Sequence, residues 1–170
     1  MTSIIYSKVE KLCKKYKTRD PYELANALGI IVLFRDLKLL KGFYTIDKQT
    51  RYIAINQQLD ENRQKLICAH ELGHDSLHQH YAQFSYLRDF TLFDYTGRIE
   101  HEANLFASDL IIPDTDLLLK ACWECYTYKQ IARVFRVPEQ LVRLKAFSME
   151  KRGHRMHIPE SVKSDFIKDV

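Results

Sequence analysis

The spacing of hydrophobic residues along the chain predicts helices at both ends and a short run of strands between them. Apolar residues recur at every third or fourth position, the period of a helix with one buried face, in seven stretches: residues 3–16, 21–28, 59–78, 99–112, 116–122, 127–135 and 138–147. Asp20 followed by Pro21 is a typical helix start, and Gly29 stands where a glycine commonly ends a helix. The polar, aromatic stretch 79–97 predicts a loop, and the residues after 151 predict an extended tail.

Three β-strands are predicted between the second and third helices. Residues 30–34 form a continuous, partly β-branched apolar run, which indicates a buried strand. Residues 42–46 and 51–55 alternate between apolar and polar positions and flank a turn-like stretch at 47–50, which predicts a β-hairpin. The expected fold class is therefore α+β, with a small three-stranded sheet that is antiparallel or mixed.

Composition places the chain among ordinary globular proteins. Of its 170 residues, 46% are hydrophobic and 28% are charged, which excludes disordered and fibrous classes. The length fits one domain, or one domain plus a small appendage. The longest apolar run, residues 30–34, is far shorter than the ~20 residues that span a bilayer, and charge near the N-terminus interrupts any signal peptide. We therefore expect a cytoplasmic protein.

The run His70-Glu71-Leu72-Gly73-His74 lies inside a predicted helix. Two histidines four residues apart project from the same side of a helix, so both imidazoles can reach one metal ion. Glu71 lies beside them, where a carboxylate can take a proton from a water that zinc activates. This pattern predicts a zinc site with His70 and His74 as ligands and Glu71 as the general base.

A catalytic zinc site needs a third protein ligand, and histidines further along the same segment are one source. His80 nearly fits a longer pattern with a third histidine, but Leu77 occupies the position where that pattern needs a glycine to turn the chain. His78 lies about 6 Å further along the helix axis than His74, too far to close the site without a bend. Both histidines are therefore the less favoured candidates.

A carboxylate on the helix at 99–112 is the favoured third ligand. The buried stripe expected for this helix consists of four apolar residues: Ile99, Ala103, Phe106 and Leu110. Glu102 borders that stripe and can point inward, whereas Glu100 and His101 lie further round the helix. An inward carboxylate is costly unless a cation meets it, and a zinc ion would be that cation.

The histidine motif, together with the run from Glu102 to Pro113 about 30 residues later (E-A-N-x-F-A-x-x-L-x-x-P), resembles the ImmA/IrrE family of metallopeptidases. The resemblance includes Lys41-Gly42-Phe43-Tyr44 and covers about residues 20–115. It implies a zincin-like peptidase core at 1–115 and a helical C-terminal region at 116–170 packed on that core. It also implies zinc as the cofactor, with His70, His74 and Glu102 as its ligands and Glu71 as the general base.

The resemblance further implies an intracellular bacterial endopeptidase that cleaves a helix-turn-helix repressor and relieves repression in a prophage or mobile element. A zinc-holding pseudo-peptidase that acts only by binding its repressor is an alternative, which the intact Glu71 disfavours. Tyr86, Tyr95 and His101 are three candidates for an additional electrophile, and the sequence does not choose among them.

A DNA-binding regulator is the rival interpretation of the C-terminal region. Residues 127–142 resemble a helix-turn-helix, and residues 120–170 hold 11 basic and 6 acidic residues, a net charge of +5, against 15 basic and 16 acidic residues in the rest of the chain. However, Arg136 stands where the turn commonly has glycine, and the second helix is rich in leucine and valine. We therefore favour packing of these helices on the core over DNA binding.

Overall fold

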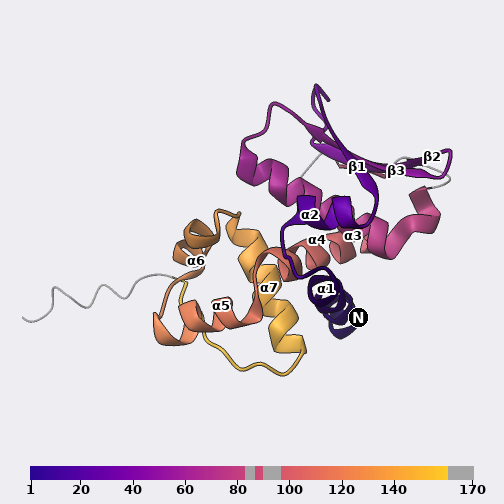
Figure 1. Ribbon diagram of the computed structural model, residues 1–170. Coiled ribbons are helices and arrows are strands. Elements are labelled where there is room, and N and C mark those ends of the chain that lie inside the picture. The colour runs from indigo at the N-terminus through magenta and orange to yellow at the C-terminus, as the bar shows by residue number, and fades with distance from the viewer. Residues whose placement is uncertain (83–86, 90–96, 161–170) are drawn as a thin grey trace, which may run out of the picture.

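A computed structural model describes residues 1–82, 87–89 and 97–160 of the chain (Figure 1). Its helices form where the hydrophobic period predicts them: α1 (Thr2–Tyr16), α2 (Pro21–Ala27), α3 (Glu61–Ala82), α4 (Arg98–Ile111), α5 (Asp114–Leu118), the π-helical turn η1 (Leu119–Trp123), α6 (Tyr128–Phe135) and α7 (Glu139–Lys151). The predicted start of α2 is confirmed, because the Asp20 carboxylate accepts hydrogen bonds from the backbone N–H groups of Tyr22 and Glu23.

The three predicted strands are present as β1 (Ile30–Arg35), β2 (Gly42–Asp47) and β3 (Thr50–Asn56). β2 and β3 form the predicted antiparallel hairpin, and β1 runs parallel to β3, so the sheet is mixed. A short additional strand, β4 (Leu87–Asp89), pairs with the start of β2 inside the stretch that was predicted to be a loop. The strand order is therefore β1-β3-β2-β4.

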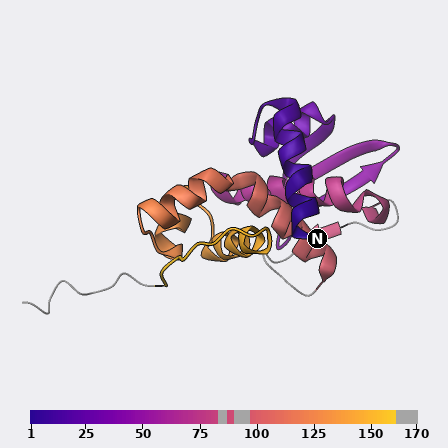
Figure 2. The same ribbon diagram turned by 90° about the horizontal axis from the view of Figure 1, so that it is seen from below.

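The elements pack in layers that put α3 and α4 at the centre of the molecule. α3 lies between the sheet and α4, and α4 in turn contacts α1 and α7 (Figures 1 and 2). Because neighbours surround α4 on several sides, every residue from 103 to 110 of this helix is buried. Among the residues that the structure describes, no helix combines the length and the apolar character that a membrane crossing requires.

The C-terminal helices share one hydrophobic core with the rest of the molecule, which includes Ile53 of β3, Phe106 of α4 and Met149 of α7. They lie at the opposite end of the molecule from the sheet (Figure 2). Residue 115, the expected boundary between a peptidase core and a C-terminal region, lies inside α5.

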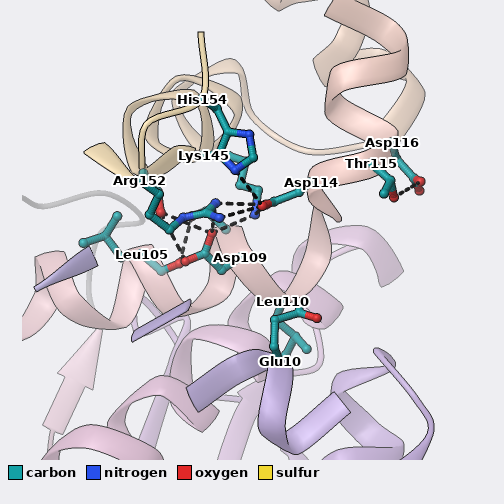
Figure 3. A network of polar contacts seen from close by, with 12 residues as sticks. Glu10, Leu105, Asp109, Leu110, Asp114, Thr115, Asp116, Lys145, Arg152 and His154 are labelled. Carbon is teal, nitrogen blue, oxygen red and sulfur yellow. Dashed lines mark hydrogen bonds and ion pairs between the residues drawn. The ribbon is translucent and has the colours of Figure 1, made fainter. Parts of the chain in front are cut away.

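Buried charges cross this boundary (Figure 3). The Lys145 ammonium is fully buried and lies 2.7 Å from an Asp109 oxygen and 2.6 Å from an Asp114 oxygen. The Arg152 guanidinium, directly after α7, also binds Asp114, with a contact of 2.6 Å. Two acidic residues from the end of α4 and the start of α5 are thus neutralised by two basic residues from the α7 region.

The helix that would read DNA in a helix-turn-helix is mostly covered. Arg136 forms the turn between α6 and α7 in a left-handed conformation, with φ of +54°. Val142 and Lys145 of α7 are fully buried, and the Arg143 guanidinium binds the carboxylates of Glu139 and Glu160. These contacts support the interpretation in which the C-terminal helices pack on the core.

Candidate metal centre

Helix α3 brings the two motif histidines together in the interior. His70 and His74 are both almost completely buried, and their Nε2 atoms lie 3.0 Å apart. Their spacing of four residues places them one turn apart on the same face, as the sequence predicts. The Nε2 atoms of both histidines therefore point at one small region beside α4.

The third member of this group is Glu100, near the start of α4. Its Oε2 atom lies 3.2 Å from Nε2 of His70, and its Oε1 atom lies 3.5 Å from Nε2 of His74. Within residues 1–82, 87–89 and 97–160, this is the group of three metal-ligating side chains whose ligand atoms all lie within 4.8 Å of one another. We call His70, His74 and Glu100 the metal group.

The structure does not bring Glu102, the carboxylate expected from the sequence, into the metal group. One Glu102 oxygen lies 3.0 Å from Nε2 of His78, and the other lies 2.7 Å from Nε of Arg98. The expectation assumed that α4 has a single buried stripe. Because α4 is buried on several sides, that stripe does not identify the face that meets α3.

Close contact between two small residues defines the face of α4 that meets α3. A Cβ atom added at Gly73 would lie only 2.9 Å from Cα of Ala103, so the two helix backbones approach closely here. Glu100 precedes Ala103 by three residues and Ala107 by seven, which places all three on one face. The alanine spacing is therefore the sequence signal that identifies Glu100.

The partners of the metal group leave its nitrogen atoms suited to bind a cation. The amide oxygen Oδ1 of Asn104 lies 2.9 Å from Nδ1 of His70, and because this oxygen only accepts, His70 donates through Nδ1 and keeps a lone pair on Nε2. Burial lowers the pKa of His74 to about 4, so this imidazole is neutral at pH 7. Burial acts to raise the pKa of Glu100, but its contacts with His70 and His74 outweigh burial and hold that pKa well below its usual range.

These side chains fit a zinc ion. Two neutral imidazoles and one ionised carboxylate are a donor set that catalytic zinc sites use, with a fourth position left open. Ligand atoms about 2.0–2.2 Å from a common ion in tetrahedral geometry stand about 3.3 Å apart. The separations of 3.0, 3.2 and 3.5 Å within the metal group match that arrangement.

Glu71, the expected general base, follows His70 on α3 and is fully buried beneath β2. A Cβ atom at Gly42 of β2 would lie 3.3 Å from an oxygen of Glu71 and 2.4 Å from the side chain of Ile67. Only glycine at this strand position lets β2 lie so close to the carboxylate. The sheet therefore covers Glu71 from one side.

Of the three candidates for an additional electrophile, the structure describes His101 alone. Tyr86 and Tyr95 lie outside the described residues. His101 lines a depression of about 290 Å³ together with Arg143, Leu144 and other residues of α7. Consecutive helical residues point about 100° apart, so His101 lies on a different face of α4 from Glu100.

The chain that carries this site is similar to known proteins over most of its length. Residues 25–147 match a family of peptidases described as the IrrE N-terminal-like domain. The chain is 39% identical over 147 residues to "Uncharacterized immunity region protein 2" of Bacillus phage phi105, an alignment that covers 86% of this chain and 91% of that protein. It is also 30% identical over 159 residues to "Metallopeptidase ImmA" of Bacillus subtilis (strain 168), covering 92% of each chain. All three alignments are long enough to span the histidine motif and α4.

Proposed function

Because the chain belongs to the ImmA/IrrE family of metallopeptidases, we propose that it is an intracellular zinc-dependent endopeptidase with the metal group as its zinc site. The observation that carries this proposal is the convergence of two buried Nε2 atoms and one ionised carboxylate within 3.0–3.5 Å. Here His70, His74 and Glu100 are the ligands. Glu71, buried beside them on α3, is the general base.

The reaction is hydrolysis of a peptide bond, and Glu71 carries its proton transfers. A bound zinc ion supplies a Lewis acid that polarises the substrate carbonyl and lowers the pKa of water from about 15.7 toward about 7. Glu71 takes the proton of the attacking water and then gives it to the nitrogen of the leaving amine. Burial of Glu71 under β2 shields this carboxylate from bulk solvent, which strengthens its interaction with the water it deprotonates.

The substrate in this proposal is a helix-turn-helix repressor of a prophage or mobile element. The support comes from relatives of this chain, because one is named for a phage immunity region and another is named as the metallopeptidase ImmA. Both align over more than 85% of the present chain, so the comparison includes the C-terminal helices as well as the metal group. Cleavage of such a repressor would end the repression that it maintains.

Two variants on α4 separate the candidate third ligands. Glu100→Gln and Glu102→Gln make the same change two residues apart, and each purified protein is titrated with Zn²⁺ in competition with a chromophoric chelator. Loss of a residue that only hydrogen-bonds to a ligand costs about 10–100-fold in metal affinity. Glu100 is itself a proposed ligand, so we expect Glu100→Gln to weaken Zn²⁺ binding by more than that. Glu102→Gln keeps a carbonyl that accepts a hydrogen bond, so it should remain close to the parent. The opposite order would show that Glu102 is the ligand.

Glu71→Gln tests the chemistry with the metal retained. We expect this variant to bind Zn²⁺ like the parent and to leave a helix-turn-helix repressor substrate intact, whereas the parent cuts that repressor into two fragments detected by mass spectrometry. Chelator treatment of the parent should give the same result as the variant. If Glu71→Gln still inactivates the repressor without cutting it, the pseudo-peptidase interpretation replaces the one proposed here.

A further inference from the structure

A third histidine, His78, follows the metal group on α3. It comes four residues after His74 and is 97% buried, as its exposed fraction is only 3%. Its Nδ1 atom lies 3.3 Å from Nδ1 of His74, on the side of that ring opposite the metal group. The backbone leaves helical geometry at His78, with φ of −129° and ψ of 19°, so α3 bends where this contact forms.

The other nitrogen of His78 contacts Glu102 of α4. Nε2 of His78 lies 3.0 Å from Oε2 of Glu102, and the second oxygen of Glu102 accepts a hydrogen bond of 2.7 Å from Nε of Arg98. Both carboxylate oxygens therefore have a donor. A continuous chain of contacts runs from Glu102 through His78 to His74, and it ends at the metal group.

The chemistry of these groups fixes the direction of each hydrogen bond in the chain. An ionised carboxylate only accepts, so His78 donates through Nε2. Neutral His78 then carries its lone pair on Nδ1 and accepts from Nδ1–H of His74. His74, having its proton on Nδ1, keeps a lone pair on Nε2, the atom that faces His70 and Glu100.

The opposite tautomer of His74 would not suit the metal group. A proton on Nε2 would remove the lone pair that a metal needs and would place an N–H group at the centre of the site. His70 avoids this outcome directly, because Asn104 accepts its Nδ1 proton. At His74 the neighbour of Nδ1 is instead another imidazole, that of His78, whose own orientation must be fixed by a further group.

We propose that His78 and Glu102 are positioning residues that hold His74 in the tautomer and ring orientation that bind the metal. This inference rests on the proposed function, since it takes the metal group as a zinc site. It also explains why Glu102 faces the interior without being part of the metal group: its oxygen accepts the hydrogen bond that orients His78. Partners of this kind raise the basicity of a ligating imidazole and fix its orientation.

Substitutions at both positions separate hydrogen bonding from packing. His78→Leu removes the chain, whereas His78→Gln keeps a side chain that can accept from His74 and donate to Glu102 at the same time. Glu102→Leu removes the terminal acceptor. His80→Leu is the matched control, because it makes the same change two residues later at an exposed position of α3. The full chain is used throughout, and thermal unfolding of each metal-free protein verifies that it is folded.

Zn²⁺ affinity and the visible absorption spectrum of the Co²⁺-loaded protein are the measurements, and neither depends on peptidase activity. We expect His78→Leu and Glu102→Leu to weaken Zn²⁺ binding about 10–100-fold and to change the Co²⁺ spectrum. His78→Gln should lie closer to the parent than to His78→Leu, and His80→Leu should match the parent. The double variant His78→Leu/Glu102→Leu should lose no more than the larger single loss, because both changes break one chain.

Parental affinity and spectrum in a folded His78→Leu protein would overturn the proposal. Equal losses in His78→Leu and His78→Gln would also overturn it, because they would indicate packing rather than hydrogen bonding. If His78→Leu does not fold, Glu102→Leu carries the same test from the other end of the chain. A parent that binds no Zn²⁺ refutes the proposed function itself, whereas a parent that binds Zn²⁺ alongside an unaffected Glu102→Leu refutes only the positioning role.

Discussion

At the scale of single residues, each imidazole of the metal group is held by a partner on its Nδ1 atom. His70 donates to Asn104 of α4, and His74 contacts His78 of its own helix. These partners orient both imidazoles before any ion binds, and burial keeps His74 neutral at pH 7. Folding therefore already orders two of the side chains that a metal ion would bind.

The stability of the metal-free protein should fall as the pH falls from about 6.5 to about 4. Burial lowers the pKa of His74 to about 4, while an unfolded histidine keeps its ordinary pKa of about 6.5. In this window the unfolded chain binds a proton that the folded chain does not, so acidification lowers the free energy of unfolding, by on the order of 3 kcal/mol across the window. Urea unfolding of chelator-treated protein at several pH values measures this, and His74→Leu should show a shallower dependence. Parallel curves for parent and variant would contradict it.

Gly73→Ala should loosen the contact between α3 and α4. The added Cβ would lie 2.9 Å from Cα of Ala103, so the helices must separate, at a cost of about 1–3 kcal/mol in unfolding free energy. Zn²⁺ affinity should fall as well, because Glu100 would move away from the two histidines. Gly97→Ala is the matched control, since nothing lies within 4 Å of a Cβ added there. Equal stability of the two variants would show that the contact is not tight.

At the scale of elements, α4 connects the metal group to the C-terminal helices. Glu100 near its start faces α3, and Asp109 near its end meets Lys145 of α7. The pKa of Asp109 is raised by burial, although the nearby Lys145 acts in the opposite direction. A helix with charged contacts at both ends and apolar contacts between them has one defined position, which keeps Glu100 in place.

Lys145→Met should destabilise the protein strongly without creating a large cavity. The substitution keeps most of the side-chain volume but leaves Asp109 and Asp114 without the ammonium that neutralises both, and breaking a buried ion pair costs about 3–5 kcal/mol. Lys129→Met, at an exposed position of α6, should change stability by no more than about 0.5 kcal/mol. Denaturant unfolding compares the two, and a small effect for both would mean that the buried charges do not fix α7.

At the scale of the whole molecule, one core extends from the sheet to α7. Residues of β3, α3, α4 and α7 belong to the same buried cluster, and the charged contacts of Figure 3 cross the chain position where a domain boundary was expected. Part of the positive charge of the C-terminal region is thus paired with carboxylates of the same chain, at Lys145, Arg152 and Arg143.

A fragment of residues 1–115 should not fold on its own. It lacks α7, against which α1 and α4 pack, and it lacks both cations that neutralise Asp109 and Asp114. We expect the full chain to unfold in one cooperative thermal transition and the fragment to show none, by circular dichroism. A sharp transition in the fragment, with Zn²⁺ binding like the parent, would show instead that residue 115 marks a domain boundary.

The sequence alone determined the features of this protein that depend on neighbours along the chain. Helix periods, the Asp20 cap and the β2–β3 hairpin are local, and so is the spacing that puts His70 and His74 on one face with Glu71 beside them. Backbone geometry converts each of these patterns into structure without reference to the rest of the fold.

Only the tertiary structure decided which carboxylate joins the two histidines. α4 is buried on several sides, so its apolar residues do not mark a single inward face, and the close contact of Gly73 with Ala103 selects the face that carries Glu100. The bend at His78 and the packing of α3 on α4 bring Glu102 to His78 instead. The pairing of β4 with β2 and the burial of Lys145 were decided in the same way, because each depends on a contact between segments distant in sequence.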